Sequence, residues 1–133
     1  MSGKYLLGNM LSAMANKRYF YNVPVVVEYS KLCESVLEVI KQAGYIADYN
    51  VVDNDGKKSI EVLLRIINGK KVMNTFKLLT KPGCRYYITA QDLKKKLKYN
   101  EFSLCIVSTS CGVMNSVDAV EKNIGGEVLC EIF

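Results

Sequence analysis

Hydrophobic residues recur at two different spacings along the chain, and these spacings predict its helices and strands. Apolar positions three or four residues apart predict amphipathic helices over residues 4–17 and 31–43. Ser30 is a favoured N-cap for the second of them. Runs rich in β-branched residues predict strands over residues 23–27, 45–52, 59–67 and 71–79. Turn residues at 53–56 and at Asn68-Gly69 join the last three strands as an antiparallel meander.

The second half of the chain predicts shorter elements of mixed type. The turn at residues 80–83 suits a hinge between two lobes. Beyond it, apolar runs predict strands over residues 84–88, 102–107 and 127–133. Thr89 and Ser116 suit the N-caps of two short helices. The order predicts an α+β fold of two small lobes. Residues 1–79 form helix-strand-helix-strand-strand, and residues 80–133 form mostly antiparallel strands with short helices.

The strand that ends at Val107 stops abruptly at three hydroxyl side chains. These are Ser108, Thr109 and Ser110, and they are followed by Cys111 and Gly112. Each hydroxyl can donate and accept hydrogen bonds, and Gly112 permits a backbone conformation closed to other residues. Small side chains at the end of a rigid strand let a partner approach closely, so this loop suits a base edge, a phosphate or a carboxylate. The alternative is a plain polar turn between two strands.

Positive charge is concentrated in the middle of the chain. The net charge is +5, yet residues 57–98 carry twelve Lys or Arg against two acidic residues, a local balance of +10. The flanking segments 1–56 and 99–133 carry −1 and −4. This distribution favours one face turned towards a polyanion, with a solvated Lys-rich surface as the alternative. The acidic ends leave open a further role, as a module that meets a basic protein partner.

The composition excludes several kinds of chemistry. The chain has no His, so a triad with a His base is excluded. Its five cysteines are scattered without a CxxC pair, and we expect no metal or other cofactor. A small hydrolase with Ser110 or Cys111 as nucleophile is the alternative, but it lacks a base and the glycines of a nucleophile elbow. No apolar run reaches the roughly 18 residues of a membrane span. We therefore expect no enzyme, no small-molecule substrate and no membrane partner.

Three groups of residues carry a family resemblance. Residues 108–114 read Ser-Thr-Ser-Cys-Gly-Val-Met, and residues 125–130 read Gly-Gly-Glu-Val-Leu-Cys. Residues 81–87 read Lys-Pro-Gly-Cys-Arg-Tyr-Tyr. In this order and spacing they closely resemble motifs of the eighth small-subunit ribosomal protein family, bacterial type. Residues 23–24, 30–32 and 44–46 also sit where that family has similar residues, so the resemblance covers essentially the whole chain.

The resemblance implies a primary rRNA-binding protein. It would bind a helix in the central domain of small-subunit rRNA and help to assemble the platform beside neighbouring small-subunit ribosomal proteins, with residues 80–133 as the rRNA-binding lobe. Hydroxyl groups at a strand end suit irregular, unstacked bases, and basic side chains suit phosphates. Tyr86 and Tyr87 alternate along a strand, so one of them is expected to pack inward. The candidate rRNA-binding residues are Ser108, Thr109, Ser110, Gly112, Lys81, Gly83, Arg85, Tyr87, Ser30, Lys31, Gly125, Gly126 and Glu127.

The chain departs from the family at positions that are usually basic. These positions hold Ala13, Ala15, Cys111, Val117, Val120 and Glu121. Salt-sensitive, sequence-independent affinity is therefore expected to be lost first, while specificity survives. Fifteen Lys against three Arg, with many Asn, Ile and Tyr, suggest an AT-rich genome, and the start of the chain does not resemble a transit peptide. We expect a protein of the small ribosomal subunit that is encoded in an organelle and works in the mitochondrial matrix, in preference to the bacterial cytoplasm.

Overall fold

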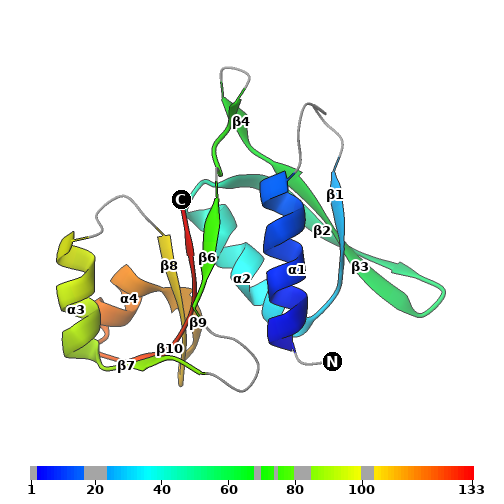
Figure 1. The fold of residues 1–133 in the computed structure, drawn as a ribbon. Helices are drawn as coiled ribbons and strands as arrows, with labels where there is room; N and C mark the ends of the chain where they lie inside the picture. Colours follow the sequence, from blue (N-terminus) through cyan, green and yellow to red (C-terminus); the bar gives the residue numbers. More distant parts are fainter. Residues whose placement is uncertain (1–2, 17–23, 68–69, 74, 80–84, 100–103) are drawn as a thin grey trace. The chain divides into compact units, whose positions relative to one another are not determined.

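The structure is a computed structural model that describes residues 3–16, 24–67, 70–73, 75–79, 85–99 and 104–133 (Figure 1). The chain divides into two compact units, Met1–Thr75 and Phe76–Phe133. Each unit combines α-helices with antiparallel strands, which confirms the predicted two-lobed α+β fold. In the described parts of the chain, none of the helices is long and apolar enough to cross a membrane.

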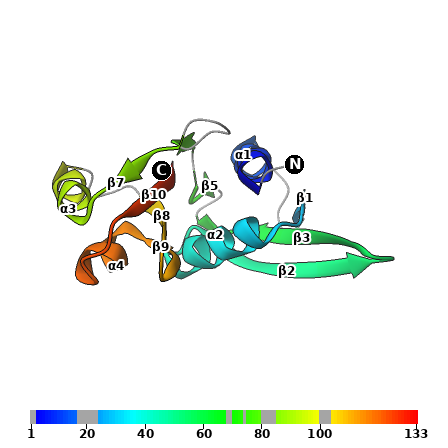
Figure 2. The same cartoon turned by 90° about the horizontal axis from the view of Figure 1, so that it is seen from below.

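The first unit has two helices on one face of a three-stranded antiparallel sheet. Its elements are α1 (Gly3–Asn16), β1 (Val25–Glu28), α2 (Lys31–Gln42), β2 (Ile46–Asn54), β3 (Lys57–Leu64), β4 (Ile66–Ile67) and β5 (Lys70–Lys71). The strand order is β1-β3-β2, and Figure 2 shows both helices on the same side of this sheet. Alternation along the strands explains this arrangement, because Val25 and Val27 are buried while Val26 between them is exposed. Fully buried helix residues complete the core, among them Leu7, Met10, Leu11, Met14, Leu37 and Ile40.

Local sequence signals set the ends of these elements. The Ser30 side chain accepts a hydrogen bond from the backbone N–H of Cys33 at 3.0 Å, which confirms the predicted N-cap of α2. Asp55 and Gly56 have φ values of 53° and 84°, as the two central residues of a type I′ hairpin require. Strands β4 and β5 pair with each other around the predicted second hairpin, whose residues Asn68-Gly69 lie outside the described part of the chain.

The second unit has a five-stranded sheet and two helices. Its elements are β6 (Phe76–Leu78), β7 (Tyr87–Ile88), α3 (Ala90–Tyr99), β8 (Leu104–Thr109), β9 (Gly112–Asn115), α4 (Ser116–Glu121) and β10 (Gly126–Ile132). The order is β6-β10-β8-β9, and β7 also pairs with β10. As predicted, Thr89 caps α3: its hydroxyl accepts from the N–H of Asp92 at 3.2 Å. The cap of α4 is Asn115 and not Ser116 as predicted, because the Asn115 side chain accepts from the N–H of Val117.

One predicted strand is divided between the two units. Residues 71–79 were expected as a single strand of the first lobe, but β5 ends at Lys71 and β6 begins at Phe76. Strand β6 pairs with β10 through the register Leu78↔Cys130 and Phe76↔Ile132, so it belongs to the second unit. The reason is that β10 offers a long partner with apolar residues at matching positions. The compact units accordingly meet at residues 75 and 76, a few residues before the expected boundary at 79 and 80.

Candidate RNA-binding surface

The hydroxyl loop is a tight hairpin between β8 and β9. Thr109 pairs with Gly112, so that Ser110 and Cys111 form the exposed tip. Gly112 has φ +110°, a value that L side chains rarely adopt, and it lets β9 start directly after the tip. The sequence therefore places a small, exposed hydroxyl at the end of a buried strand, as the pattern of residues 104–112 predicted.

The hydroxyl of Thr109 is engaged inside this hairpin. Its Oγ1 accepts from the backbone N–H of Cys111 at 3.1 Å and donates to the backbone carbonyl of Gly112 at 2.8 Å. Ser110, in contrast, makes no hydrogen bond with any residue that the structure describes, and it is exposed. The two neighbouring hydroxyl groups thus differ: Thr109 holds the turn in shape, and Ser110 presents a donor and an acceptor to solvent.

A row of paired residues crosses the sheet beside this hairpin. Tyr87 on β7 pairs with Glu127 on β10, Glu127 pairs with Ser108 on β8, and Ser108 pairs with Val113 on β9. Directly paired residues project to the same face of an antiparallel sheet. The adjacent row, Val128, Val107 and Met114, belongs to the hydrophobic core that includes Leu93 of α3 and Ala119 of α4. The row that contains Ser108 therefore lies on the opposite face from the helices.

Arg85 adds a cation to this row. Its Nη1 donates to Tyr87 Oη over 3.4 Å. This hydrogen bond and the negative charge of Glu127 raise the pKa of Arg85, so its guanidinium stays fully protonated. Tyr87 is 65% exposed and Tyr86 is 47% exposed, so the expectation that one of them packs inward is wrong. The side chains of Arg85, Tyr86 and Tyr87 are all accessible to a ligand.

Gly125 and Gly126 have a packing role that the sequence did not disclose. A Cβ on Gly126 would clash with the carbonyl oxygen of Ser108, and one on Gly125 would clash with the carbonyl oxygen of Ile88. The two glycines therefore let the start of β10 pass close to β8 and β7. They position the surface, because the first of these close approaches lies at Ser108 itself.

The remaining candidate residues belong to other parts of the chain. Ser30 and Lys31 belong to the first unit, where Lys31 is exposed and the Ser30 hydroxyl already caps α2. Lys81 and Gly83 lie outside the described residues. Their predicted RNA contacts stay predictions.

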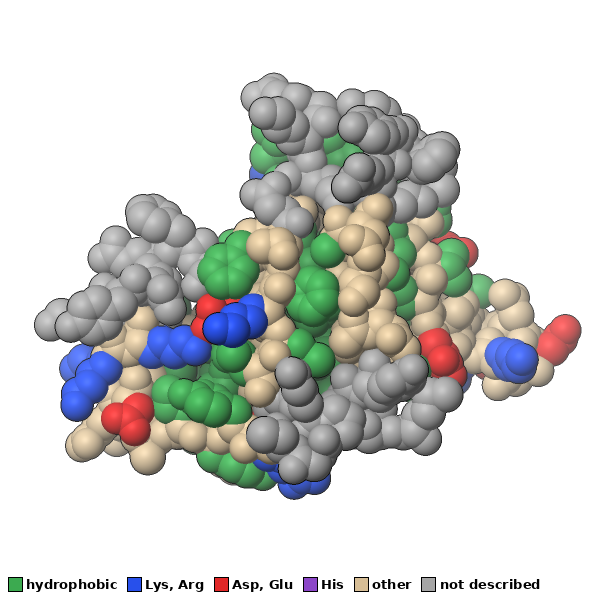
Figure 3. Space-filling model, in the orientation of Figure 1, with side chains coloured by type: hydrophobic (Ala, Val, Ile, Leu, Met, Phe, Trp, Pro, Cys, Tyr) green, Lys and Arg blue, Asp and Glu red, His purple; other side chains and the backbone are tan. Residues whose placement is uncertain are grey.

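The lysines of α3 are not equivalent. Lys94 and Lys95 are exposed, and Figure 3 shows basic side chains gathered over this helix. Lys96 instead forms an ion pair with Glu131, which is 5% exposed on β10. Burial opposes protonation of Lys96, but the hydrogen bond to Glu131 and its charge raise the pKa of Lys96 overall. Sequence reasoning missed this pair, although an acid within an otherwise apolar strand is a signal of a buried partner.

Two of the buried cysteines, Cys105 and Cys130, are poorly suited to act as nucleophiles. Burial raises the pKa of the Cys105 thiol to about 11, and burial also raises the pKa of Cys130. Such thiols are poor nucleophiles at neutral pH. Cys111 is exposed at the hairpin tip. Among the residues that the structure describes, no group of His, Cys, Asp or Glu side chains is placed to hold a metal ion.

Comparison with known proteins identifies the class of this chain. The profile of the family described as "Ribosomal protein S8" matches residues 6–133. The chain therefore belongs to the ribosomal protein S8 family, a family of structural ribosomal proteins and not of enzymes. This confirms the family resemblance and the expectation that the chain is not an enzyme.

Individual relatives match over nearly their whole length. The chain is 35% identical over 127 residues to the small ribosomal subunit protein uS8 of Wolbachia pipientis subsp. Culex pipiens (strain wPip), covering 96% of this chain and 95% of that protein. It is 38% identical over 128 residues to uS8 of Bartonella tribocorum, with 96% of each chain covered. For uS8 of Buchnera aphidicola subsp. Cinara cedri the identity is 32% over 132 residues, with 99% of each covered. These relatives are bacterial and do not support a mitochondrial origin.

Proposed function

We propose that this protein is an rRNA-binding constituent of the small ribosomal subunit. It holds an irregular helix in the central domain of small-subunit rRNA and thereby helps to assemble the platform, next to neighbouring ribosomal proteins. Membership of the ribosomal protein S8 family supports the general role. A mitochondrial setting rests on composition alone, chiefly on fifteen Lys against three Arg.

The observation that carries the proposal is the exposed hydroxyl of Ser110 at the tip of a rigid hairpin. Its position is fixed by the two hydrogen bonds of Thr109 and by β8, whose residues Leu104 to Val107 are buried. Proteins read RNA sequence mostly at loops, bulges and other irregular places where unstacked bases expose their edges. A small hydroxyl on a fixed support can enter such a place and can donate to or accept from a base edge or a ribose.

The neighbouring groups supply complementary contacts. Arg85 offers a permanent positive charge for a phosphate. The exposed ring of Tyr87 offers a flat apolar surface and a phenol hydroxyl for a ribose or a base. Ser108 is half-buried and lies in the same row as Tyr87, whereas Glu127 between them is buried. We propose that Lys81, Gly83, Ser30, Lys31 and Gly112 extend this contact, while Gly125 and Gly126 act by positioning the strands.

The test is the replacement Ser110→Ala, measured on two RNAs. One RNA is an irregular helix from the central domain of small-subunit rRNA, and the other is a regular duplex of the same length. Loss of a hydrogen bond to a buried base group should cost about 1 to 3 kcal/mol on the irregular helix, which is roughly a fivefold to 150-fold loss of affinity. The loss on the regular duplex should be smaller.

A matched control separates base reading from general damage. Ser35→Ala removes a hydroxyl of the first unit that donates to the backbone carbonyl of Lys31 at 3.0 Å. This variant should keep its affinity for both RNAs. Equal losses of Ser110→Ala on the two RNAs, or no loss at all, would show that the hydroxyl turn does not read bases.

A further inference from the structure

The outer edge of β2 is an open strand edge. In the order β1-β3-β2, strand β2 lies at one side of the sheet and pairs with β3. No strand within the described ranges pairs with its other side. At nine residues β2 is long for an edge strand, and unpaired edges are templates on which another chain can add a strand.

The register of the β2–β3 hairpin identifies the backbone groups that point outward. In a two-residue hairpin the flanking pair, Asn54 and Lys57, is the hydrogen-bonded pair, and hydrogen-bonded and non-hydrogen-bonded pairs then alternate. Tyr49, Val51 and Asp53 therefore direct their N–H and C=O groups away from β3. The opposite side of β3 agrees with this alternation. Lys58, the partner of Asp53, accepts from Tyr29 N–H at 3.3 Å on the β1 side.

One of the outward groups already has a partner. The N–H of Tyr49 donates to the carboxylate of Asp48 at 2.8 Å. A register irregularity lies at the same end of the strand, between Ile46 and Asp48, and it ends the regular edge there. The open part therefore runs from the carbonyl of Tyr49 through both backbone groups of Val51 to those of Asp53. The Val51 side chain is 41% exposed beside it.

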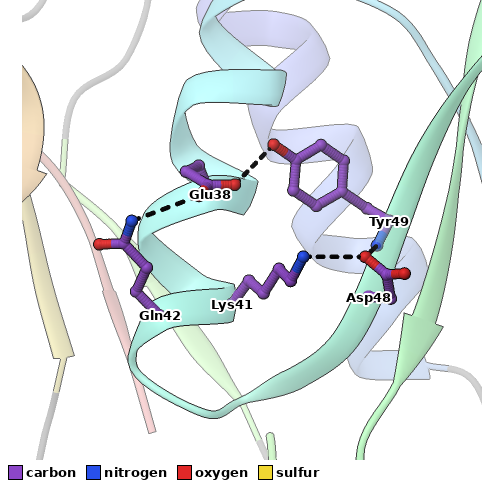
Figure 4. A network of polar contacts seen from close by, with 5 residues as sticks. All are labelled: Glu38, Lys41, Gln42, Asp48 and Tyr49. Carbon is purple, nitrogen blue, oxygen red and sulfur yellow. Dashed lines mark hydrogen bonds and ion pairs between the residues drawn. The ribbon is translucent and has the colours of Figure 1, made fainter.

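Two carboxylates and one ammonium group lie at the Tyr49 end of this open part (Figure 4). Glu38 of α2 accepts from Tyr49 Oη at 2.7 Å and from Gln42 at 3.2 Å, and Lys41 pairs with Asp48 at 3.0 Å. Burial, the hydrogen bond to Glu38 and the charges of Glu38, Glu34 and Asp48 raise the pKa of Tyr49 to about 12. The ammonium group of Lys58 lies 5.3 Å from the ring centroid of Tyr29, on the β1 side and away from this edge. Lys41 also lies here: it pairs with Asp48, and its ammonium group is 5.7 Å from the ring centroid of Tyr49. Against this one positive charge stand the carboxylates of Glu34, Glu38 and Asp48, so the net charge near Tyr49 is negative.

The net negative charge determines which kind of molecule can pair with the edge of β2. RNA phosphates would meet carboxylates, so the edge is unsuited to the nucleic acid that the second unit is proposed to bind. A second copy of the chain would bring the same carboxylates to the same edge, and like charges disfavour that pairing. An extended polypeptide that carries Lys or Arg satisfies both the open backbone groups and the carboxylates.

We propose that the edge from Tyr49 to Asp53 accepts a basic, extended segment of another protein as an added β-strand. Backbone hydrogen bonds to Val51 and Asp53 hold the strand. Glu38 and Glu34 select its charge, because Asp48 is already paired with Lys41. Within the small subunit such a segment belongs to a neighbouring ribosomal protein; that assignment rests on the proposed function, whereas the edge itself does not.

The test uses the full chain, labelled with ¹⁵N, and a capped eight-residue peptide of alternating Lys and Thr as the probe. We expect the amides of Val51 and Asp53 to exchange with solvent on the order of tenfold more slowly when the peptide is bound. The same peptide with alternate backbone amides N-methylated, and a peptide of alternating Glu and Thr, should give no such protection.

Two variants of Val51 complete the experiment. Val51→Pro removes an outward N–H group and no hydrogen bond to β3, so the variant should fold but should no longer bind the peptide. Val51→Thr keeps the N–H group, so it should fold and bind the peptide. Equal binding of the methylated peptide would overturn strand addition, because charge alone would then explain it. Absence of protection at Val51 and Asp53 would overturn the proposal outright. Loss of rRNA binding in a folded Val51→Pro variant would also overturn the strand-addition proposal, because the edge would then contact RNA. If Ser110→Ala does not weaken RNA binding, the proposed function fails but the strand-addition proposal stands.

Discussion

Gly126 of β10 lies so close to the backbone carbonyl of Ser108 on β8 that a Cβ at residue 126 would clash with it. Ser108 is the first of the three hydroxyl residues and pairs with Glu127, the next residue on β10. The glycine therefore lets β10 lie close to β8 at the residue where the hydroxyl loop begins. Gly126 belongs to the segment 125–130 that resembles a family motif. The close approach of the two strands explains sterically why a glycine stands at this position.

Gly126→Ala should destabilise the second unit. The added methyl group meets backbone atoms, which cannot move aside as the end of a flexible side chain can. Overpacking of this kind typically costs about 1 to 3 kcal/mol. Urea unfolding monitored by circular dichroism should show a lower midpoint. An unchanged midpoint would mean that the two strands separate freely at Ser108, and that Gly126 is available for a direct RNA contact.

Thr109 should act on RNA through Ser110 and not by direct contact. Thr109→Val keeps the shape of the side chain and removes the hydrogen bonds of its hydroxyl, to Cys111 N–H, to the Gly112 carbonyl and to Met114 Sδ. We expect weaker RNA binding for this variant and recovery in Thr109→Ser, which restores the hydroxyl. In a double-mutant cycle with Ser110→Ala, the two losses should be strongly non-additive. Additive losses would indicate that Thr109 contacts RNA independently.

Cys105 should contribute to a fall in stability at alkaline pH. Burial raises the pKa of its thiol to about 11 from an ordinary value of 9.0. A raised pKa in the folded state means that the unfolded chain releases its proton first. The contribution to stability is therefore complete below pH 9 and is lost as the pH rises towards 11. One such group gives a slope of at most about 1.4 kcal/mol per pH unit.

The measurement is the free energy of unfolding between pH 8 and pH 11. Cys105→Ala removes this titration and should flatten the alkaline decline, although it lowers stability at neutral pH through the lost packing. Cys111→Ala, which removes an exposed thiol at the hairpin tip, is the matched control for the substitution itself. A decline of the same steepness in Cys105→Ala would assign the effect to other groups.

The elements that sequence reasoning located correctly are those with a local physical cause. Ser30 and Thr89 cap helices because their side chains can reach a backbone N–H in the following turn. Asp55-Gly56 forms a hairpin because both residues tolerate positive φ. The division of residues 71–79 had no such local cause, since it depends on β10, a strand more than fifty residues further along the chain.

In the candidate surface, too, only the features with a local cause could be predicted from the sequence. The abrupt change from apolar residues to Ser108 and Ser110 was sufficient to predict an exposed hydroxyl turn. It did not disclose that Thr109 is engaged within the turn, because that depends on the backbone path to Gly112. The exposure of both Tyr86 and Tyr87 could not be predicted either, since strand alternation leaves open whether anything covers the second face.

The lysines of α3 allow contacts with RNA phosphates to be distinguished from a structural ion pair. Lys94 and Lys95 are exposed, so changing both to Gln should flatten the salt dependence of RNA binding if they contact phosphates. Each lost phosphate contact lowers the log–log slope by roughly 0.7 to 0.9. Lys96→Gln should leave this slope unchanged, because the Lys96 ammonium group is held by Glu131.

Lys96→Gln should instead lower stability, since it leaves the carboxylate of Glu131, with only 7% of the side chain exposed, without its cation. Removing one partner of a fully buried ion pair costs about 3 to 5 kcal/mol. The side chain of Lys96 is 23% exposed, so a smaller loss, on the order of 2 kcal/mol, is expected here. Glu131→Gln is the matched control, and it should reduce stability without flattening the salt dependence. A Lys96→Gln variant with full stability and a flatter salt dependence would show that Lys96 leaves Glu131 to bind a phosphate.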